Sequence, residues 1–240
     1  MIRRLGVIGD LHGEHERLAR ALEWLAGQRL DGLICTGDVA DGRGCINQSC
    51  RLLREAGVVT VAGNHDRWLL EDRVRHVADA HRLEEVDEAN LAFLQSLPRS
   101  RSLETVAGSL LLCHGVGDDD LGKVWPGTAR SRVERSERLD QVIAEGRFRF
   151  MVNGHLHYRV LIDFHELLLL NAGTLKGDFS GISVMDFADD VVAAWEVSDG
   201  GPVRRACEHP LLEAGQRRRF RDTAEFDGAW EPVTLYRQPM

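Results

Sequence analysis

The sequence of 240 residues contains no long apolar run and no excess of positive charge. No stretch approaches the ~20 consecutive apolar residues of a membrane-spanning helix, so no membrane span is predicted. The chain has 30 basic and 38 acidic side chains and a formal net charge of −8, which argues against extensive nucleic-acid binding. A small phosphorylated substrate is compatible with this charge, because bound metal ions supply positive charge locally.

Cysteine is also scarce, and the chain begins without an apolar leader. The number of cysteines is five, which is odd, and their spacing matches no zinc ribbon or CxxC motif. We therefore expect reduced thiols in a reducing compartment. Residues 1–6 enter a strand-like run directly and lack the apolar stretch of a signal peptide. Together these features predict a cytoplasmic protein, and they leave its oligomeric state open.

The first two thirds of the chain alternates strand-like and helix-like segments. Gly32–Thr36 and Val58–Ala62 are short apolar runs that end at glycine, and His15–Gly27 carries apolar residues at helical spacing. Ser131–Ala144 also has a helical pattern. Alternation of this kind predicts βαβ units, with parallel strands covered by helices.

The pattern changes after about residue 158. Four strand-like runs follow one another with short turns, which predicts an antiparallel meander in a second sheet. The runs are Tyr158–Asp163, Glu166–Leu170, Gly181–Phe187 and Val191–Val197. From about residue 200 to 240 the chain is polar and weakly periodic, and we expect a peripheral tail. No linker divides the sequence, so one domain of class α/β (α+β) over residues 1–240 is predicted.

Five short segments place metal-ligand side chains directly after an apolar strand. Ligands of open α/β sheets gather outside the carboxyl ends of the strands, so we expect these side chains to meet in one place. The segments are Gly9–Gly13, Gly37–Gly42, Gly63–Asp66, Cys113–Gly115 and Gly154–His157. The candidate ligands within them are Asp10, His12, Asp38, Asn64, His114, His155 and His157.

These residue types suit two divalent transition metals, because imidazole nitrogen is combined with carboxylate and amide oxygen. Mn, Fe, Zn, Co and Ni all fit this chemistry, and we favour Mn. Asp38 lies in the middle of the set and has two oxygens, so it can bridge two ions. Two such ions clamp the attacking and leaving oxygens of a phosphoryl transfer, and a water between them becomes the nucleophile.

The five segments, in this order, resemble the calcineurin-like metallophosphoesterase superfamily, with its D-x-H, G-D, G-N-H-D/E, lone His and G-H-x-H pattern. The resemblance implies a four-layer α-β-β-α sandwich of two mixed sheets flanked by helices. Every metal-ligand position of the superfamily's pattern is occupied by an expected residue in this sequence. Asp10, His12 and His157 bind the first metal, Asn64, His114 and His155 bind the second, and Asp38 bridges the two.

The resemblance also assigns roles to residues that are not ligands. His65 protonates the leaving oxygen, and Asp66 holds the His65 ring; the alternatives are a structural histidine and a helix cap. Arg43 and Arg67 follow metal-bearing segments, and each either grips a phosphate or forms a surface salt bridge. Trp125, with Lys123 in the same loop, either covers the substrate or packs against the protein.

The sequence therefore predicts a metal-dependent phosphoester hydrolase, with phosphodiesterase activity preferred. Asn171–Thr174 resembles the N-P-G-S turn of the small bacterial phosphodiesterases, with Ala172 in place of proline. Two alternatives stay open. Asp41–Gly44 comes close to the G-D-x-x-D-R-G segment of serine/threonine protein phosphatases and dinucleoside polyphosphatases. A non-catalytic scaffold of the same fold would lack ligands, whereas this sequence lacks none.

Overall fold

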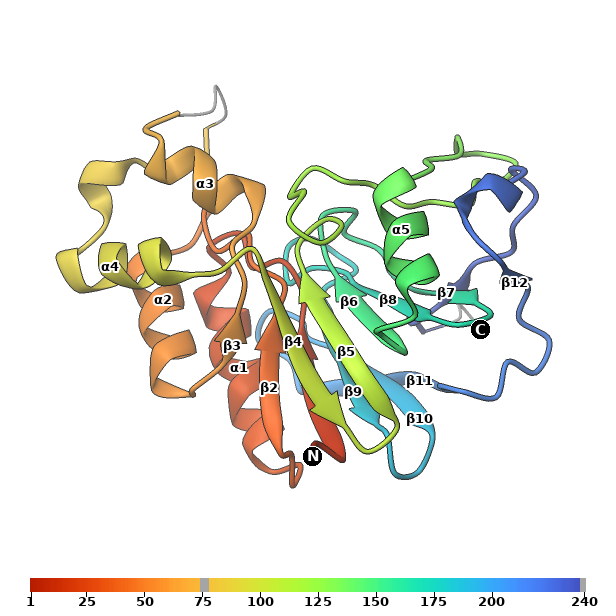
Figure 1. Cartoon of the computed structure of the whole chain (residues 1–240). Helices are drawn as coiled ribbons and strands as arrows, with labels where there is room; N and C mark the ends of the chain where they lie inside the picture. The colour runs from red at the N-terminus through yellow and green to blue at the C-terminus, as the bar shows by residue number, and fades with distance from the viewer. Residues whose placement is uncertain (74–77, 238–240) are drawn as a thin grey trace.

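In the computed structural model, which describes residues 1–73 and 78–237, two facing sheets are flanked by helices (Figure 1). The first sheet has the order β11-β10-β9-β1-β2-β3. The second has the order β12-β7-β8-β6-β5-β4, and β13 also pairs with β7. The predicted α-β-β-α sandwich of two mixed sheets is confirmed. Within the described residues, no helix combines the length and apolarity that crossing a membrane requires.

The bounds of the elements are as follows. The first sheet contains β1 (Arg4–Ile8), β2 (Gly32–Cys35), β3 (Val59–Thr60), β9 (Gly181–Asp186), β10 (Val191–Glu196) and β11 (Arg204–Pro210). The second contains β4 (Ser100–Thr105), β5 (Gly108–Cys113), β6 (Phe150–Asn153), β7 (Arg159–Phe164), β8 (Leu168–Ala172), β12 (Arg219–Phe220) and β13 (Val233–Thr234). The helices are α1 (His15–Ala26), α2 (Ile46–Glu55), α3 (Asn64–Leu70), α4 (Glu88–Ser96) and α5 (Glu137–Glu145), with 3-10 turns at Leu83–Glu85 and Thr223–Glu225.

Period-2 alternation along the strands divides the core into layers. Val7 of β1 lies in the apolar layer between the two sheets, whereas its neighbour Ile8 packs with the helices α1 and α2. In β5, Leu112 faces the same inter-sheet layer, and Leu111 lies in the cluster that contains Leu139 of α5. Each sheet is therefore buried on both faces, which positions the ends of its strands rigidly.

The predicted βαβ units are present in the first sheet. β1 and β2 pair in parallel, as do β2 and β3, and α1 and α2 connect them. α1 buries Leu18, Ala21 and Leu25, which recur at helical spacing. In the second sheet β5 and β6 are parallel as well. The loops that follow these strands therefore lie at corresponding ends of the two sheets.

Before residue 200, three parts of the fold differ from the sequence-based expectation. The predicted meander is divided: β7 and β8 join β6 in the second sheet, whereas β9 and β10 continue the first sheet beside β1. β4 was not predicted, because its sequence SRSLET is polar and it occupies a sheet edge. The helix expected over Ser131–Ala144 begins only at Glu137, where the side chain of Ser136 accepts a hydrogen bond from Leu139 N.

The C-terminal segment is more regular than the predicted peripheral tail. β11 extends the first sheet at its edge, and β12 and β13 pair with β7 in the second sheet. Phe220, Phe226 and Trp230 are buried in the apolar cluster beneath α5. Short edge strands have little periodicity of their own, so the sequence carries no strong signal for them.

Candidate metal centre

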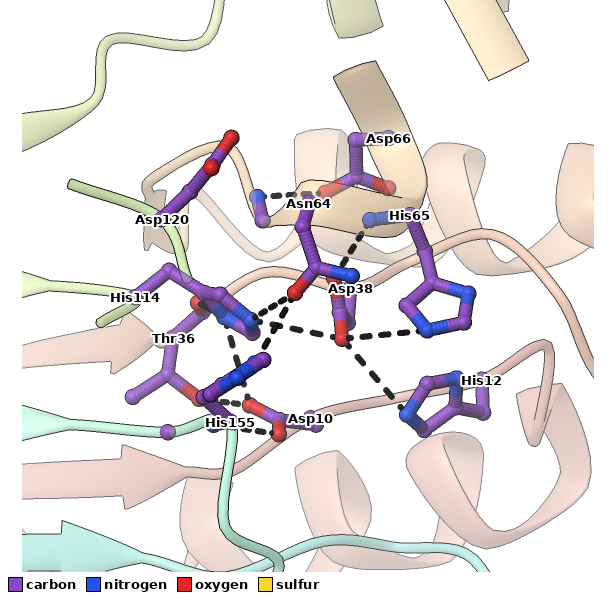
Figure 2. A network of polar contacts seen from close by, with 12 residues as sticks. Asp10, His12, Thr36, Asp38, Asn64, His65, Asp66, His114, Asp120 and His155 are labelled. Atoms are coloured by element: carbon purple, nitrogen blue, oxygen red, sulfur yellow. Dashed lines mark hydrogen bonds and ion pairs between the residues drawn. The ribbon is translucent and has the colours of Figure 1, made fainter. Parts of the chain in front are cut away.

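The five segments singled out in the sequence meet between the two sheets. They follow β1, β2, β3, β5 and β6, and their polar side chains converge on one point (Figure 2). Most of these side chains are almost completely buried. Figure 2 shows Asp38 in the middle, with His114 and His155 on one side and His12 and His65 on the other.

The first group of candidate ligands forms a tight cluster. Asp10, His12, Asp38 and His157 each offer one ligand atom, and these atoms lie within 4.8 Å of one another. The Nε2 atoms of His12 and His157 are 2.9 Å apart, and His157 Nε2 lies 3.4 Å from Asp10 Oδ2. Thr36 Oγ1 donates a hydrogen bond of 2.7 Å to Asp10 Oδ1 and holds that carboxylate in place.

The second group surrounds the side-chain oxygen of Asn64. His114 Nε2 lies 3.0 Å from Asn64 Oδ1, and His155 Nδ1 lies 2.9 Å from the same oxygen. The carboxylate of Asp38 connects the two groups. Its Oδ2 atom lies 3.3 Å from His114 Nε2 and 3.7 Å from His12 Nε2. Asp38 thus lies between the two groups, in contact with a histidine of each.

The hydrogen bonds around the histidines leave acceptor atoms that point at one another. His12 Nδ1 donates to the carbonyl of Asp41 at 2.9 Å, and His114 Nδ1 donates to the carbonyl of Thr36 at 2.8 Å. The Nε2 atom of His114 is therefore directed at the oxygens of Asn64 and Asp38, where it holds either a proton or a metal ion. Lone pairs that converge in this way need a proton or a cation between them, so the donor set fits divalent metal ions.

The pKa values of the histidines and of Asp10 agree with this interpretation. Burial lowers the pKa of His12 to about 3 and that of His155 to about 4, so both rings are neutral, the form that binds metal. Burial also lowers the pKa of His114, but the carboxylates of Asp38 and Asp10 outweigh it and raise the value to about 10. Burial raises the pKa of Asp10 to about 7. Metal binding here must displace protons.

The backbone at the site is strained. His12, Asp38, His155 and His157 have φ values of 48°, 46°, 68° and 61°, in the left-handed region that non-glycine residues seldom occupy. Four of the seven candidate ligands are therefore held in costly conformations. Such strain persists only where the surrounding structure enforces it, and it concentrates at functional sites.

Two glycines allow the segments to approach each other. A Cβ atom on Gly63 would lie 2.1 Å from Asp38 Oδ1, and one on Gly154 would lie 2.0 Å from Asp10 Oδ1. Any side chain at these positions would displace a candidate ligand. The glycines in the G-N-H-D and G-H-x-H segments are thus required by the packing of the carboxylates.

His65 lies beside the cluster and is oriented by a residue that was not assigned from the sequence. His65 Nδ1 lies 2.7 Å from Asp41 Oδ2, so the opposite nitrogen, Nε2, points toward the centre, 3.9 Å from Asp38 Oδ2. Asp41 has a φ of 65°, and its other oxygen accepts from His81 N at 3.0 Å. The sequence feature that points to Asp41 is its position three residues after Asp38, as in the G-D-x-x-D pattern.

The predicted role of Asp66 as the carboxylate that holds the His65 ring is wrong. The Asp66 carboxylate accepts hydrogen bonds from Gly63 N at 2.9 Å and from Ala40 N at 3.0 Å. It therefore caps the first turn of α3 and ties that turn to the loop after β2. Neighbours in a helix point in different directions, so adjacency in sequence to His65 did not bring the two side chains together.

The two candidate substrate-binding arginines differ in their surroundings. Arg67 donates from Nε and Nη2 to the two oxygens of Asp120 at 2.6 and 3.0 Å, so its fork is occupied by a carboxylate. This favours the salt-bridge alternative. Arg43 is exposed and makes no ion pair with any residue of 1–73 and 78–237. Of these two arginines, Arg43 stays a candidate for binding a phosphate.

A sandwich of two mixed sheets with histidine, aspartate and asparagine side chains gathered at its strand ends defines the class of metal-dependent phosphoester hydrolases. The family model of the calcineurin-like phosphoesterase superfamily domain matches residues 4–189. The chain belongs to this superfamily, as its motifs indicated, and it is a metal-dependent phosphoesterase. No curated protein sequence matches the chain.

Solved structures with the same fold are distant in sequence. The phosphoesterase YfcE from E. coli is 17% identical, with a TM-score of 0.53 over 87% of this chain and 99% of its own. An archaeal phosphodiesterase is 14% identical, with a TM-score of 0.52 over 80% and 98%. Vacuolar protein sorting 29 from Cryptosporidium parvum is 20% identical, with a TM-score of 0.55 over 87% and 98%. At these identities the likeness shows the fold alone.

Proposed function

We propose that this chain hydrolyses phosphodiesters at a dinuclear metal site, with Mn²⁺ as the preferred ion. Asp10, His12 and His157 would hold one ion and Asn64, His114 and His155 the other, with Asp38 between them. Bound divalent ions supply Lewis-acid stabilisation of the phosphate oxygens and lower the pKa of a water that serves as nucleophile. The observation that carries the proposal is the position of the Asp38 carboxylate, within 3.7 Å of a histidine from each group.

His65 is the residue that we assign to the leaving group. Its Nδ1 proton is directed at Asp41, so the proton that it gives to a substrate oxygen comes from Nε2. A ring that carries both protons is positively charged, and the adjacent carboxylate of Asp41 stabilises that charge. His65 thus protonates the leaving alcohol as it departs, while Asp41 keeps the ring oriented.

The choice of diester over monoester is supported by the turn at Asn171–Thr174 and by an archaeal phosphodiesterase among the structural neighbours. Asn171 Nδ2 donates to the carbonyl of Gly154 at 2.7 Å, so this turn supports the loop that carries His155 and His157. The pairing of His65 with Asp41 is the observation that favours the alternative of a protein phosphatase or dinucleoside polyphosphatase, because Asp41 is the second aspartate of the segment that resembles their G-D-x-x-D-R-G pattern.

The test combines metal content with turnover on one preparation. We expect about two Mn²⁺ per chain and a higher kcat/KM for bis-p-nitrophenyl phosphate than for p-nitrophenyl phosphate. Asp38→Ala is expected to lose metal and to lower kcat/KM by about 10³-fold or more, since it removes a ligand from both ions. The control is Asp189→Ala, because Asp189 is exposed in a turn far from the site in the fold.

Other outcomes would redirect the assignment. A large preference for the monoester, with metal bound, would replace the diesterase by a phosphatase. If two metals are bound but neither the wild type nor His65→Ala hydrolyses any phosphoester, the phosphodiesterase and the phosphatase assignments are both wrong. The chain would then be a non-catalytic scaffold.

A further inference from the structure

A small hollow lies beside the loop that carries two candidate ligands. Leu156 stands between His155 and His157, and Tyr158 follows directly, so the wall of the hollow and the metal centre share one loop. The volume of the hollow is about 230 Å³. Its lining comes from this loop and from the loop after β5: Lys123, Trp125, Ser131, Arg132, Glu134, Leu156 and Tyr158.

Two aromatic rings form one wall of the hollow. The ring centroids of Trp125 and Tyr158 are 5.3 Å apart, with an interplanar angle of 36°. Trp125 is fixed, because its Nε1 donates to Ser131 Oγ at 2.7 Å and its ring meets Trp230 edge-on at 5.1 Å. Tyr158 is 55% exposed, so most of its ring is available to a ligand. Trp125 is thus the rigid part of the wall, and Tyr158 is the part that a ligand can contact.

The rim of the hollow carries positive charge that is not neutralised by ion pairs. Lys123 and Arg132 are exposed, and within residues 1–73 and 78–237 neither forms an ion pair or a side-chain hydrogen bond. Glu134 is the acidic residue of the lining. In a chain of net charge −8, this is a place where an anion is favoured.

We propose that this hollow binds one organic group of the substrate and selects phosphodiesters that carry a planar ring, of which a nucleobase is the biological form. The inference rests on the proposed diesterase function. A base stacks on Tyr158 against the fixed indole of Trp125, while Lys123 and Arg132 attract the phosphate. A phosphodiester of the same charge that carries an alkyl group leaves the exposed ring faces of the wall in water. It therefore gains no stacking energy from Tyr158 and Trp125.

The test compares two esters with the same leaving group, methyl p-nitrophenyl phosphate and thymidine 5′-(p-nitrophenyl phosphate), in the Mn²⁺-loaded protein. We expect a KM about tenfold lower for the thymidine ester, as one stacked base contributes in other proteins. Tyr158→Ala is expected to remove this difference. Lys123→Gln is expected to raise KM for both esters, because they share the phosphate. Phe179→Ala, a change of an aromatic residue that is 67% exposed outside the hollow, is the matched control.

A binding measurement separates the failure of this proposal from the failure of the diesterase assignment. Calorimetric titration with thymidine 5′-monophosphate and with methyl phosphate needs no turnover. Tighter binding of the nucleotide to the wild type, lost in Tyr158→Ala, supports the hollow even if neither ester is cleaved. Equal affinities for the two ligands, unchanged in Tyr158→Ala, would overturn the proposal whatever the activity.

Discussion

At the scale of single residues, the proposed chemistry depends on how a few carboxylates are held. Asp38 has a φ of 46° and is fixed by a hydrogen bond of 2.9 Å from His65 N to its Oδ1 atom. That bond leaves Oδ2 directed at the histidines of both groups. Asp41 holds the side chain of His65, and Asp66 holds the backbone beneath it. Three acidic residues within one region thus have three different tasks.

Asp41→Asn is predicted to lower kcat about 10- to 100-fold while the bound metal stays at the wild-type level. An asparagine keeps an oxygen for His81 N but presents an amide N–H to His65 Nδ1, which disfavours the ring form that can protonate a leaving group. The measurements are steady-state turnover of bis-p-nitrophenyl phosphate and elemental analysis of the same sample. Asp66→Asn is the control, and we expect it to lower the melting temperature instead. Unchanged kcat in Asp41→Asn would contradict the assignment.

At the scale of elements, the C-terminal segment supports the loop of the metal centre. The hydroxyl of Tyr236, which follows β13, accepts a hydrogen bond from Arg159 N at 2.7 Å and donates to the carbonyl of His157 at 3.3 Å. The buried guanidinium of Arg159 in turn donates to the carbonyls of Ile182 and Trp195 at 3.1 and 2.6 Å. Arg159 therefore joins β7 of one sheet to β9 and β10 of the other.

Tyr236→Phe is predicted to destabilise the fold by about 1–3 kcal/mol, because the buried N–H of Arg159 loses its acceptor. The phenylalanine ring keeps its place over the Arg159 guanidinium, 5.0 Å from the ring centre, so packing is preserved. We also expect weaker Mn²⁺ binding, since the carbonyl of His157 is released. Urea denaturation and a metal titration measure the two effects. Tyr158→Phe is the matched control, and an equal loss of stability there would count against this role for Tyr236.

At the scale of the whole molecule, we expect the candidate metal centre to couple the stability of the fold to pH. The two sheets meet at a cluster of buried acidic and imidazole groups, and folding alone brings these groups together as a possible metal site. Metal binding therefore stabilises the folded state by mass action. Protons compete for the same atoms, because the pKa values of His114 and Asp10 in the metal-free site are raised to about 10 and about 7.

The increase in melting temperature that Mn²⁺ causes is predicted to be larger at pH 8 than at pH 6. His114 holds a proton at both pH values, and Mn²⁺ has to displace that proton, so each decrease of one pH unit weakens Mn²⁺ binding about tenfold. Below pH 7 Asp10 is protonated as well, and a second proton then has to be displaced. Over two pH units the two protons together lower the stabilisation by about 4 kcal/mol, or roughly 8–16 °C. Thermal unfolding with Mn²⁺ and with a chelator gives the difference. Asp38→Ala is expected to show no Mn²⁺ effect, and an equal shift at both pH values would refute the proton competition.

The sequence by itself determined the parallel strands β1, β2 and β3 of the first sheet, the five segments that follow strands, and the family to which the chain belongs. These features are local: an apolar run, a glycine and a polar side chain lie within a few residues of one another. Parallel strands then bring the segments together without further information.

Only the tertiary structure decided which groups touch. It assigned Asp41 rather than Asp66 to the His65 ring, paired Arg67 with Asp120, and divided the late strands between two sheets. It also brought Trp125 next to Tyr158 to form a hollow beside the metal centre. Each of these contacts joins side chains whose directions or partners depend on distant parts of the chain, and periodicity along the sequence carries no information about them.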